Sequence, residues 1–324
     1  MCIKIEVYVK EEVCCKMKCI ICGSSDIKSV DTIVSDFVMA RIGLHNSGES
    51  RKTKLCFCRE CTFAFYEFRM SDEEDRKLYA DYRGEEYQKT REKYECWYTK
   101  KVNDALNNDQ IALGEQKRVI EKIVKENVRR ELFVALDYGG NEGKTFTDNL
   151  GTKEKYVFDI SGVKTVIGVN GISDFEELKT HSYDFIMCNM LFEHLVDPVE
   201  VMKRLYKIGN QETVFYIEVP SENPFISGNK FSIKKNISLL FNPTFSNIRL
   251  FKHYLKQRKE PFMPMKEHIN FFTKESMKRM IELNGFQVID IQENIERAVL
   301  GNSIVLSALF KKSISENTLC EKEE

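Results

Sequence analysis

The segment from Leu132 to Thr147, LFVALDYGGNEGKTFT, constrains the fold of this chain more than any other part of the sequence. Its apolar run FVAL is typical of a parallel strand that is covered on both faces. Gly139, Gly140 and Gly143 then allow a sharp turn and a close approach to a ligand, because glycine has no Cβ. We expect Asp137 to end the strand and a helix to begin after the glycines, with its free N–H groups facing the turn. The segment predicts the first strand, turn and helix of a nucleotide-binding α/β domain.

The glycines alone are also compatible with a plain turn, so the next strand matters. Tyr156-Val157-Phe158 is strand-like and ends at Asp159, 20 positions after Gly139. An acidic residue at this point can accept hydrogen bonds from ribose hydroxyls. The pair of features favours a nicotinamide cofactor or another adenosine-containing ligand, and it does not distinguish between them.

Strand-like and helix-like segments continue to alternate beyond Asp159. Further strands are predicted at residues 183–189, 213–219, 286–291 and 303–310, the last two as an antiparallel pair, and helices at 101–131, 175–178, 199–208 and 273–284. Residues 163–169 are either a third strand or the approach to one. Thr273 is expected to cap its helix and Asn284-Gly285 to end it. Residues 221–266 interrupt the order with polar, aromatic and basic residues. Such an insertion follows the carboxyl end of a strand, where open α/β sheets bind ligands.

Two Cys-x-x-Cys pairs precede this domain, Cys19–Cys22 and Cys58–Cys61. Two such pairs are the usual ligands of a tetrahedral structural zinc ion. Cys56 competes with Cys58, although only Cys58 has the matching spacing to Cys61. The gap between the pairs is long, so a small β insert is expected over 26–54. We expect a closed site that stabilises the fold without zinc chemistry; buried free cysteines are the alternative.

Residues 62–100 are rich in aromatic side chains. They are interpreted as packing between the cysteine region and the next domain, with an aromatic wall over a substrate as the alternative. Ser71 and Glu74 have the spacing of a capping box and predict the start of a helix.

Composition limits the classes of partner. The 324 residues include 49 basic and 50 acidic side chains, a net charge of −1, which argues against a global attraction to nucleic acid or to an anionic membrane. No apolar run approaches the length of a membrane span, and the first residues, MCIKIEVYVKEE, lack the apolar core of a signal peptide. Eleven cysteines without such a signal indicate reduced thiols. These features predict a cytoplasmic protein with one large domain and a smaller one.

Four motifs in this order resemble those of the class I S-adenosylmethionine-dependent methyltransferases. They are LDYGGNEG, FDIS, YDFIMCNMLFEHLVDPVEVMKRLYKI and HINFFTKESMKRMIELNGFQVI. The cysteine region is similar to the zinc-binding module that precedes the methyltransferase domain in bacterial sugar and glycan methyltransferases. The resemblance implies a Rossmann-like α/β fold with a seven-stranded sheet. It also implies a zinc-binding module at 1–70, a helical aromatic-rich connector at 71–131, a methyltransferase domain at 132–312 with the insertion 221–266, and a polar tail at 313–324.

The resemblance further implies where S-adenosylmethionine would bind. The glycine turn would hold its methionine part, Asp159 its ribose, and the turn after the fourth strand would lie near its methyl group. The implied cofactor residues are Asp137, Gly139, Gly140, Asn141, Gly143, Asp159, Asn189, Met190 and Leu191. Asn141 departs from the family's pattern, which has glycine there. Because Asn tolerates a left-handed backbone, binding is still expected; a degenerate cofactor site is the alternative.

Methyl transfer requires alignment of acceptor and methyl group and can require removal of a proton. His194 matches the proposed base of the sugar C-methyltransferases, and Glu193 would orient it or contact the substrate. His268 is the second candidate, because its motif follows the insertion. The alternatives are that Glu193 and His194 only cap and pack a helix start, and that His268 is bonded within a loop.

We therefore expect methyl transfer to a small molecule, most simply a nucleotide-linked sugar or glycan precursor. The sugar C-methyltransferases carry an extra C-terminal domain after the last strand, and its lack here favours O-methylation over C-methylation. The basic residues within 229–259 could attract a phosphate or be a solvated surface. A nucleic-acid or protein methyltransferase and a non-catalytic zinc- and nucleotide-binding protein are the alternatives.

Overall fold

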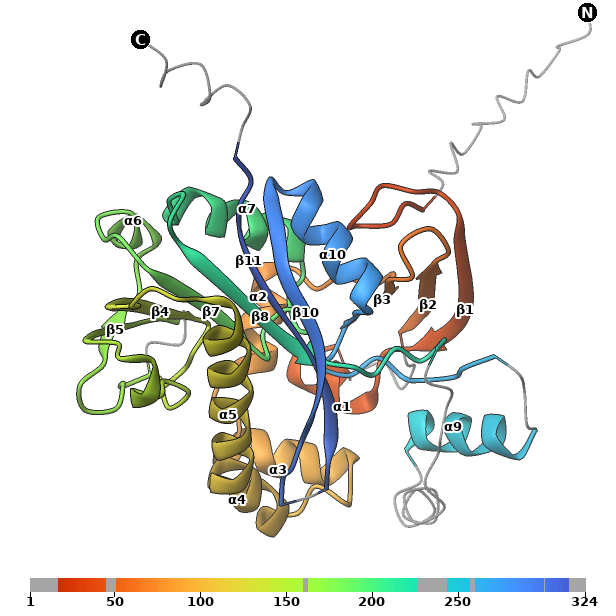
Figure 1. Cartoon of the computed structure of the whole chain (residues 1–324). Helices are drawn as coiled ribbons and strands as arrows, with labels where there is room; N and C mark the ends of the chain where they lie inside the picture. Colours follow the sequence, from red (N-terminus) through yellow and green to blue (C-terminus); the bar gives the residue numbers. More distant parts are fainter. Residues whose placement is uncertain are drawn as a thin grey trace, which may run out of the picture.

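A seven-stranded sheet forms the centre of the protein (Figure 1). The computed structural model describes residues 17–44, 51–159, 163–226, 244–256, 260–299 and 301–314. In the order β10-β11-β8-β7-β4-β5-β6, the strands are Phe286–Glu296, Ser303–Lys312, Val214–Pro220, Phe185–Asn189, Val134–Tyr138, Glu154–Phe158 and Asn170–Ile172. Strands β4 to β8 run parallel, whereas β11 runs antiparallel to both β8 and β10. The predicted fold class, a Rossmann-like sheet with an antiparallel last pair, is confirmed.

Helices cover both faces of this sheet. Helix α5 (Gln110–Asn127) buries Val119, Ile120, Ile123 and Val124, and its apolar side joins the core of one face. Helices α7 (Pro198–Ile208) and α10 (Lys274–Leu283) contribute to the core of the other face, and α6 (Phe175–Leu178) follows β6. Both sides of the parallel strands are therefore buried, as their apolar sequences predict.

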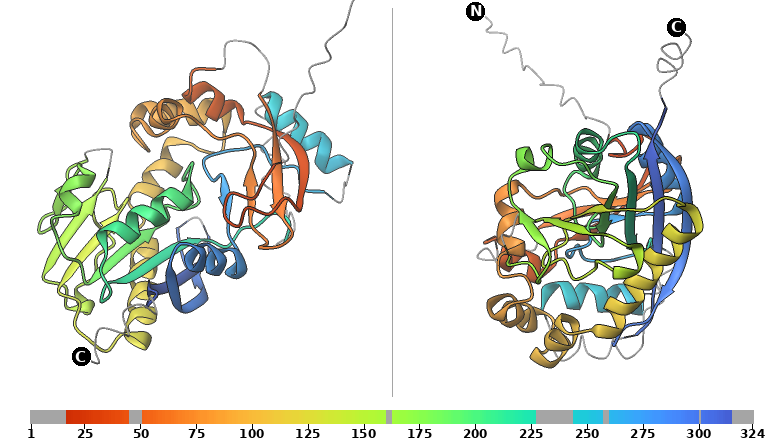
Figure 2. Two further views of the ribbon diagram at one scale, coloured as in Figure 1. Left: turned by 90° about the horizontal axis from the view of Figure 1, so that it is seen from above. Right: turned by 60° about the vertical axis from the view of Figure 1, so that its left-hand side comes forward.

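A second, four-stranded sheet contains the region around the cysteine pairs. Its order is β1-β2-β3-β9, with strands Ile27–Ile33, Lys52–Cys58, Ala64–Tyr66 and Asn270–Phe271. Helix α1 (Asp36–Arg41) lies between β1 and β2 in the chain and packs on α2 (Asp72–Tyr79) and α3 (Glu85–Tyr94), which follow β3 together with α4 (Lys100–Asn107). Figure 2 shows this small sheet beside the large one. The expected β insert at 26–54 holds β1, the start of β2 and the unpredicted helix α1.

The two sheets share side chains and backbone. The fourth strand of the small sheet, β9, comes from beyond the insertion and pairs with β3. Phe63 and Phe272 lie 4.9 Å apart between ring centroids, and the hydroxyls of Thr62 and Thr273 are 2.6 Å apart. The expected boundary at residue 70 stays a prediction, since the small sheet is completed by the later part of the chain.

The helix expected after the glycine turn is absent, and that prediction is wrong. After β4 the chain forms turns and then only the short 3-10 helix η2 (Asp148–Leu150). Gly139, Asn141 and Gly143 have φ angles of 80°, 51° and 76°. Three left-handed residues within five positions prevent a right-handed helix from starting there. The residues after the glycine turn therefore present no helix N-terminus to the turn.

Other predictions differ in detail. Residues 101–131 form α4 and α5 instead of one helix, because the chain breaks at Asn108 and Asp109, and Asp109 caps α5. Asp137 lies within β4 and not at its end. The third strand of the series, β6, begins at Asn170, so the segment 163–169 is the approach to a strand, the second of its two predicted roles.

The predicted helix caps are confirmed. Ser71 and Glu74 form a capping box at α2, and Thr273 caps α10 together with Ser276. Asn284 ends α10, and Gly285 follows with φ 84°. Most of the expected polar tail and the first sixteen residues lie outside the described ranges. Among the described helices, none has the length and apolar character needed to cross a membrane.

Candidate functional site

The four cysteines of the two Cys-x-x-Cys pairs meet in one cluster. Cys19 Sγ lies 3.6 Å from Cys61 Sγ, and Cys22 Sγ lies 3.5 Å from Cys58 Sγ. All four sulfur atoms lie within 4.8 Å of one another, and three of the residues are buried. Four convergent sulfurs are the ligand set of a closed tetrahedral zinc site.

Each cysteine pair is followed by a left-handed residue. Gly23 has φ 73° and donates its N–H to Cys19 O at 2.9 Å. Thr62 has φ 60°, which is unusual for a β-branched residue, and its hydroxyl bonds to Cys61 O. Both turns therefore end in a left-handed residue. In the first it is Gly23, and in the second it is Thr62, whose own hydroxyl bonds to the backbone.

Cys56, the sequence competitor of Cys58, lies outside the cluster. Its thiol is buried and lies 3.1 Å from Met17 Sδ. Cys58, and not Cys56, therefore belongs to the cluster, as the matching spacing to Cys61 predicts.

The glycine turn lies directly against the loop that follows β7. Gly139 N donates to Phe158 O, which ties the turn to β5. A Cβ built on Gly139 would lie 2.8 Å from a methyl group of Leu191, and one on Gly140 would overlap the Asp137 carboxyl group. Met190 has φ 51° and donates its N–H to Glu218 O. The residues predicted at the two strand ends are therefore brought together.

Two buried oxygens at these strand ends lack hydrogen-bond partners in the described part of the chain. They are Asp137 Oδ1 on β4 and Asn189 Oδ1 on β7, two strands that pair directly. The other Asp137 oxygen accepts the hydroxyl of Thr145. Burial raises the pKa of Asp137 to about 7. Adjacent acceptors without donors fit a ligand that carries an ammonium group.

Asp159 lies at the end of β5, next to the glycine turn. One of its oxygens accepts the backbone N–H of Asn141 at 2.9 Å. This bond holds Asn141 in its left-handed conformation and fixes the carboxylate beside the turn. Asp159 therefore has the position expected of a ribose-binding residue.

His194 lies in the loop that follows β7. Its backbone N–H donates to Leu191 O at 3.0 Å. Its Nδ1 lies 2.9 Å from the hydroxyl of Tyr79 and 3.2 Å from Glu267 O, so Nε2 is the ring nitrogen left for other chemistry. Nε2 lies 3.8 Å from Glu193 Oε1. The contacts at Nδ1 therefore fix the imidazole ring, and its Nε2 faces Glu193.

Glu193 and His268 complete a cluster with His194. Ligating atoms of the three residues lie within 4.8 Å of one another, and the two imidazole centroids are 4.7 Å apart. Glu193 is buried, and its Oε2 has no hydrogen-bond partner among the described residues. His268 Nδ1 contacts the carboxylate of Glu222. The three predicted catalytic candidates therefore lie at one place.

The charges of this cluster differ from those of free side chains. Burial lowers the pKa of His194 well below its usual range, and the charge of His268 lowers it further. Burial also opposes the charged form of His268, but the Glu222 carboxylate raises its pKa to about 9. Burial raises the pKa of Glu193 to about 7. At neutral pH, His194 is a neutral imidazole beside a charged His268.

The backbone of the cluster is fixed from the small sheet. Ile269 N and Asn270 N both donate to Glu193 O, and the Asn270 side chain donates to Phe192 O and Leu195 O. Arg69 Nη2 donates to Asn270 Oδ1 at 2.7 Å. Strand β9 therefore sets the position of the loop that carries His194.

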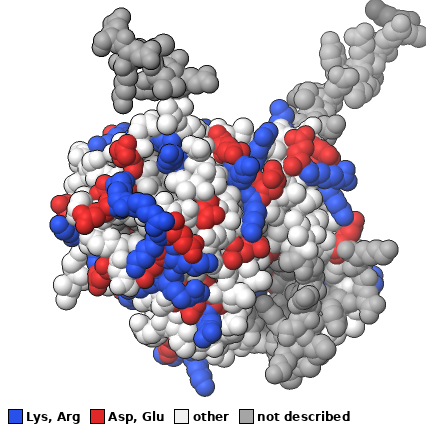
Figure 3. Space-filling view, viewed as in Figure 1, with Lys and Arg blue, Asp and Glu red and all other residues white. Residues whose placement is uncertain are grey.

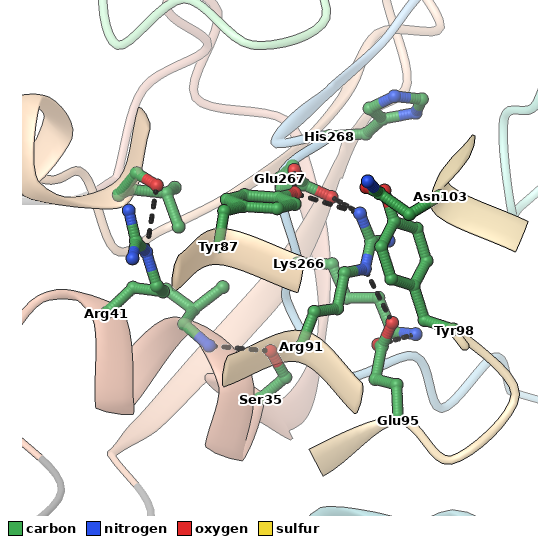
Figure 4. Close-up of polar contacts among 12 residues, drawn as sticks. Ser35, Arg41, Tyr87, Arg91, Glu95, Tyr98, Asn103, Lys266, Glu267 and His268 are labelled. Carbon is green, nitrogen blue, oxygen red and sulfur yellow. Dashed lines mark hydrogen bonds and ion pairs between the residues drawn. The ribbon is translucent and has the colours of Figure 1, made fainter. Parts of the chain in front are cut away.

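A buried ionic network on α3 holds the segment next to His268 in place (Figure 4). Arg91 pairs with Glu267 at 2.7 Å and with Glu95 at 2.9 Å, and its guanidinium lies 4.1 Å from the centroid of Tyr98. Tyr87 also contacts Glu267. The network holds the segment that contains Glu267 and His268 against α3.

Sequence reasoning missed two participants, Tyr79 and Arg83. Tyr79 belongs to the aromatic residues interpreted as packing, and only the fold shows its contact with His194. For Glu222, beside Pro220 at a strand end, the sequence leaves open contact with substrate hydroxyls or a solvated loop charge, and the structure places its carboxylate on His268. Arg83 has φ 57°, its Nε is buried without a hydrogen-bond partner among the described residues, and its charge contributes to the low pKa of His194. No spacing in the sequence connects these residues.

Comparisons with known proteins extend these observations. A family model described as "Methyltransferase domain" matches residues 111–291. No curated protein matches the chain. Among solved structures, a SAM-dependent methyltransferase from Anabaena variabilis is 13% identical, with 68% of this chain and 94% of that chain covered and a TM-score of 0.41. The 1,6-didemethyltoxoflavin-N1-methyltransferase of Burkholderia thailandensis is 12% identical, with 66% and 83% covered and a TM-score of 0.42.

Proposed function

Because this chain belongs to the methyltransferase domain family, we propose that it transfers a methyl group from S-adenosylmethionine to a hydroxyl of a small anionic acceptor, a nucleotide-linked sugar or a glycan precursor. The observation that carries the proposal is the neutral His194, whose Nδ1 contacts Tyr79. It lies in the loop after β7, and Leu191 of the same loop lies against Gly139 of the glycine turn. A neutral imidazole can accept a hydroxyl proton, and a charged one cannot.

The chain's residues fit the proposed cofactor. Its ammonium group would satisfy Asp137 Oδ1 and Asn189 Oδ1, and its ribose hydroxyls would reach the Asp159 carboxylate. The turn of Gly139, Gly140, Asn141 and Gly143, with Met190 and Leu191, would surround the methionine part. S-adenosylmethionine would supply an electrophilic methyl group on a sulfonium sulfur.

We propose that His194 Nε2 takes the proton of the acceptor hydroxyl. For this step Nδ1 carries the ring proton and donates it to Glu267 O or to the Tyr79 hydroxyl oxygen, which leaves the lone pair on Nε2 and orients the ring. Glu193 would accept a hydrogen bond from the acceptor through its unpartnered Oε2, and the charged His268 would donate to an acceptor oxygen. A hydroxyl acceptor needs only this proton transfer, so O-methylation remains our proposal over C-methylation.

Arg83 supports an anionic acceptor. Its guanidinium is close enough to lower the pKa of His194, and its buried Nε is without a hydrogen-bond partner in the described ranges. Phosphate and carboxylate groups are the usual ligands of such a guanidinium. Over the face drawn in Figure 3, basic and acidic side chains are interspersed, which supports a small molecule over a long nucleic acid.

We also propose that one zinc ion is bound by Cys19, Cys22, Cys58 and Cys61. The convergence of the four sulfurs supports the ion, and a complete set of four protein ligands supports a structural use.

Calorimetric titration with S-adenosylmethionine and S-adenosylhomocysteine tests the cofactor. Wild type and His194→Gln should bind with similar micromolar affinity, while Asp159→Ala should bind at least ten-fold more weakly. Methyl transfer should then be measured with nucleotide sugars, the matching uncharged sugars and RNA. Absence of cofactor binding by folded wild type would refute the proposal, and transfer to RNA alone would overturn the acceptor class.

A further inference from the structure

The insertion after β8 carries a helix, α9 (Phe245–Leu255), that lies at the rim of the molecule beside the small sheet (Figures 1 and 2). Its sequence FSNIRLFKHYL contains no acidic residue. The helix belongs to the segment that leaves the carboxyl end of β8 and returns to His268. The chain therefore connects α9 directly to residues of the proposed acceptor site.

One side of α9 is held by the rest of the protein. Ser246 is buried, and its N–H and hydroxyl donate to Asp36 Oδ2 at 3.0 and 2.6 Å. Asn247 contacts Tyr94 O at 3.5 Å. The helix is therefore docked in a fixed orientation through its first turn, and the opposite side faces outward.

The outward side combines apolar and basic residues. Phe245, Ile248 and Leu255 are 45%, 41% and 62% exposed. Between and beside them, three exposed cations follow at helical spacing, and all three side chains lie on this outward side: Arg249, Lys252 and Lys256. The guanidinium of Arg249 lies 5.6 Å from the ring centroid of Phe245. Helices that lie in a membrane interface carry large apolar side chains on one face and Lys and Arg on the polar face, and the exposed part of α9 offers both kinds of side chain.

We propose that this outward side of α9 binds the surface of an anionic lipid bilayer. The apolar side chains would enter the boundary between headgroups and acyl chains, and the cations would contact anionic headgroups. Charge complementarity selects this occupant, since the face has three cations and no acidic residue while the whole chain has a net charge of −1. The exposed side of α9 is therefore positively charged, whereas the protein as a whole is nearly neutral.

The consequence for the acceptor rests on the function proposed above. Binding of α9 to a lipid surface would bring acceptors carried by membrane lipids to the protein, and the chain leads from α9 to His268. The acceptor class would then be a glycan precursor attached to a lipid through a phosphate, which also matches the unpartnered Nε of Arg83.

Vesicle flotation with the zinc-replete full chain tests the proposal. Wild type should float with vesicles of phosphatidylcholine and 30% phosphatidylglycerol at low salt, and not with pure phosphatidylcholine. Two triple variants should reduce the bound fraction at least ten-fold. They are Phe245→Ser/Ile248→Ser/Leu255→Ser and Arg249→Glu/Lys252→Glu/Lys256→Glu. The matched control Lys203→Glu/Lys207→Glu/Lys278→Glu, which reverses exposed cations on α7 and α10, should bind like wild type.

Three results would overturn the proposal. They are no flotation of wild type with anionic vesicles, equal loss in the control, and a change from dimer to monomer in the apolar variant, which would show that a second copy covers the face. Titration with S-adenosylhomocysteine on the same variants should remain unchanged. Cofactor binding without flotation would reject the lipid surface alone, whereas flotation without cofactor binding would reject the proposed function alone.

Discussion

The cysteine cluster and the His194 cluster both gather side chains from distant parts of the chain, but they differ in what is left unsatisfied. In the first, four sulfurs point at one another within 4.8 Å, and three of the cysteines are buried. In the second, Glu193 Oε2 lies buried without a hydrogen-bond partner among the described residues, as does Asp137 Oδ1 in strand β4, beside the glycine turn. A closed cluster suits stability, whereas buried atoms without partners cost stability and indicate a place for a ligand.

The two clusters are also connected. Thr62, beside Cys61, contacts Thr273, and Asn223 bridges Thr62 O and Phe271 O. Strand β9 then holds the loop of Glu193 and His194. The comparison teaches that the closed cluster supports the open one, so damage to the first should reach the second, while damage to the second should stay local.

The largest effect is expected from removing a cysteine of the closed cluster. Cys58→Ser should abolish binding of one zinc ion per chain and lower the thermal unfolding midpoint by about 10 °C or more, because structural zinc sites contribute several kcal/mol to folding. Metal analysis and calorimetry measure both. Cys56→Ala is the matched control, since its thiol contacts Met17 outside the cluster, and it should retain the zinc. Equal zinc content in both variants would contradict the assignment of ligands.

Loss of activity without loss of stability is expected from the open cluster. His194→Gln should lower the rate of methyl transfer by about 10²- to 10⁴-fold, the range of general-base catalysis, and Tyr79→Phe by less. Affinity for S-adenosylhomocysteine should not change in either variant. His181→Gln serves as the control, because His181 packs on Tyr156 and Tyr183. If His194→Gln retained full activity, the base assignment would be wrong.

The glycine turn should be sensitive to one methyl group. Gly140→Ala places a Cβ on the Asp137 carboxyl group and should weaken cofactor binding at least ten-fold. Gly114→Ala in α5 meets nothing within 4 Å and should leave affinity unchanged while raising helix stability by up to about 1 kcal/mol. Titration calorimetry and thermal unfolding distinguish the two. Similar losses of affinity in Gly140→Ala and Gly114→Ala would contradict the proposed contact of the glycine turn with the cofactor.

The smallest effect concerns pH. Burial raises the pKa of Glu193 and Asp137 to about 7, above the value near 4 in an unfolded chain, so the folded state binds more protons between these values. Their contribution to stability is fully present below the unfolded pKa and is lost as pH rises through 7. The free energy of unfolding of the cofactor-free, zinc-bound protein should therefore fall from about pH 4 to pH 8, with little further change above. Glu193→Gln should reduce this fall by about 1–3 kcal/mol, and exposed Glu282→Gln should not.

The sequence predicted the large sheet well, because its strands are short apolar runs and its helix caps have local signals, as at Ser71 and Thr273. It failed at the glycine turn, where three left-handed residues replaced the expected helix. It also could not predict that β9 would complete the small sheet, because that pairing joins residues far apart in the chain.

The candidate site was predicted only where motifs reach. His194, Glu193 and His268 were named from the sequence, and the structure brings them together, although their catalytic use remains a prediction. Tyr79 and Arg83 lie in a polar and aromatic stretch without periodic spacing, so only tertiary contacts reveal them. The missing information is long-range geometry, which neither propensity nor spacing contains.

The pairing of β9 with β3 has a consequence for biosynthesis. Asn270 follows Tyr66 by 204 positions (270 − 66), so the ribosome finishes β1, β2 and β3 long before their fourth strand emerges. Until then, β3 presents an open edge, which is a template for pairing with other chains. A nascent chain truncated before residue 270 should therefore depend on chaperones or aggregate. Separate expression of the two sheets would require moving the segment Asn270–Phe271 to the N-terminal piece.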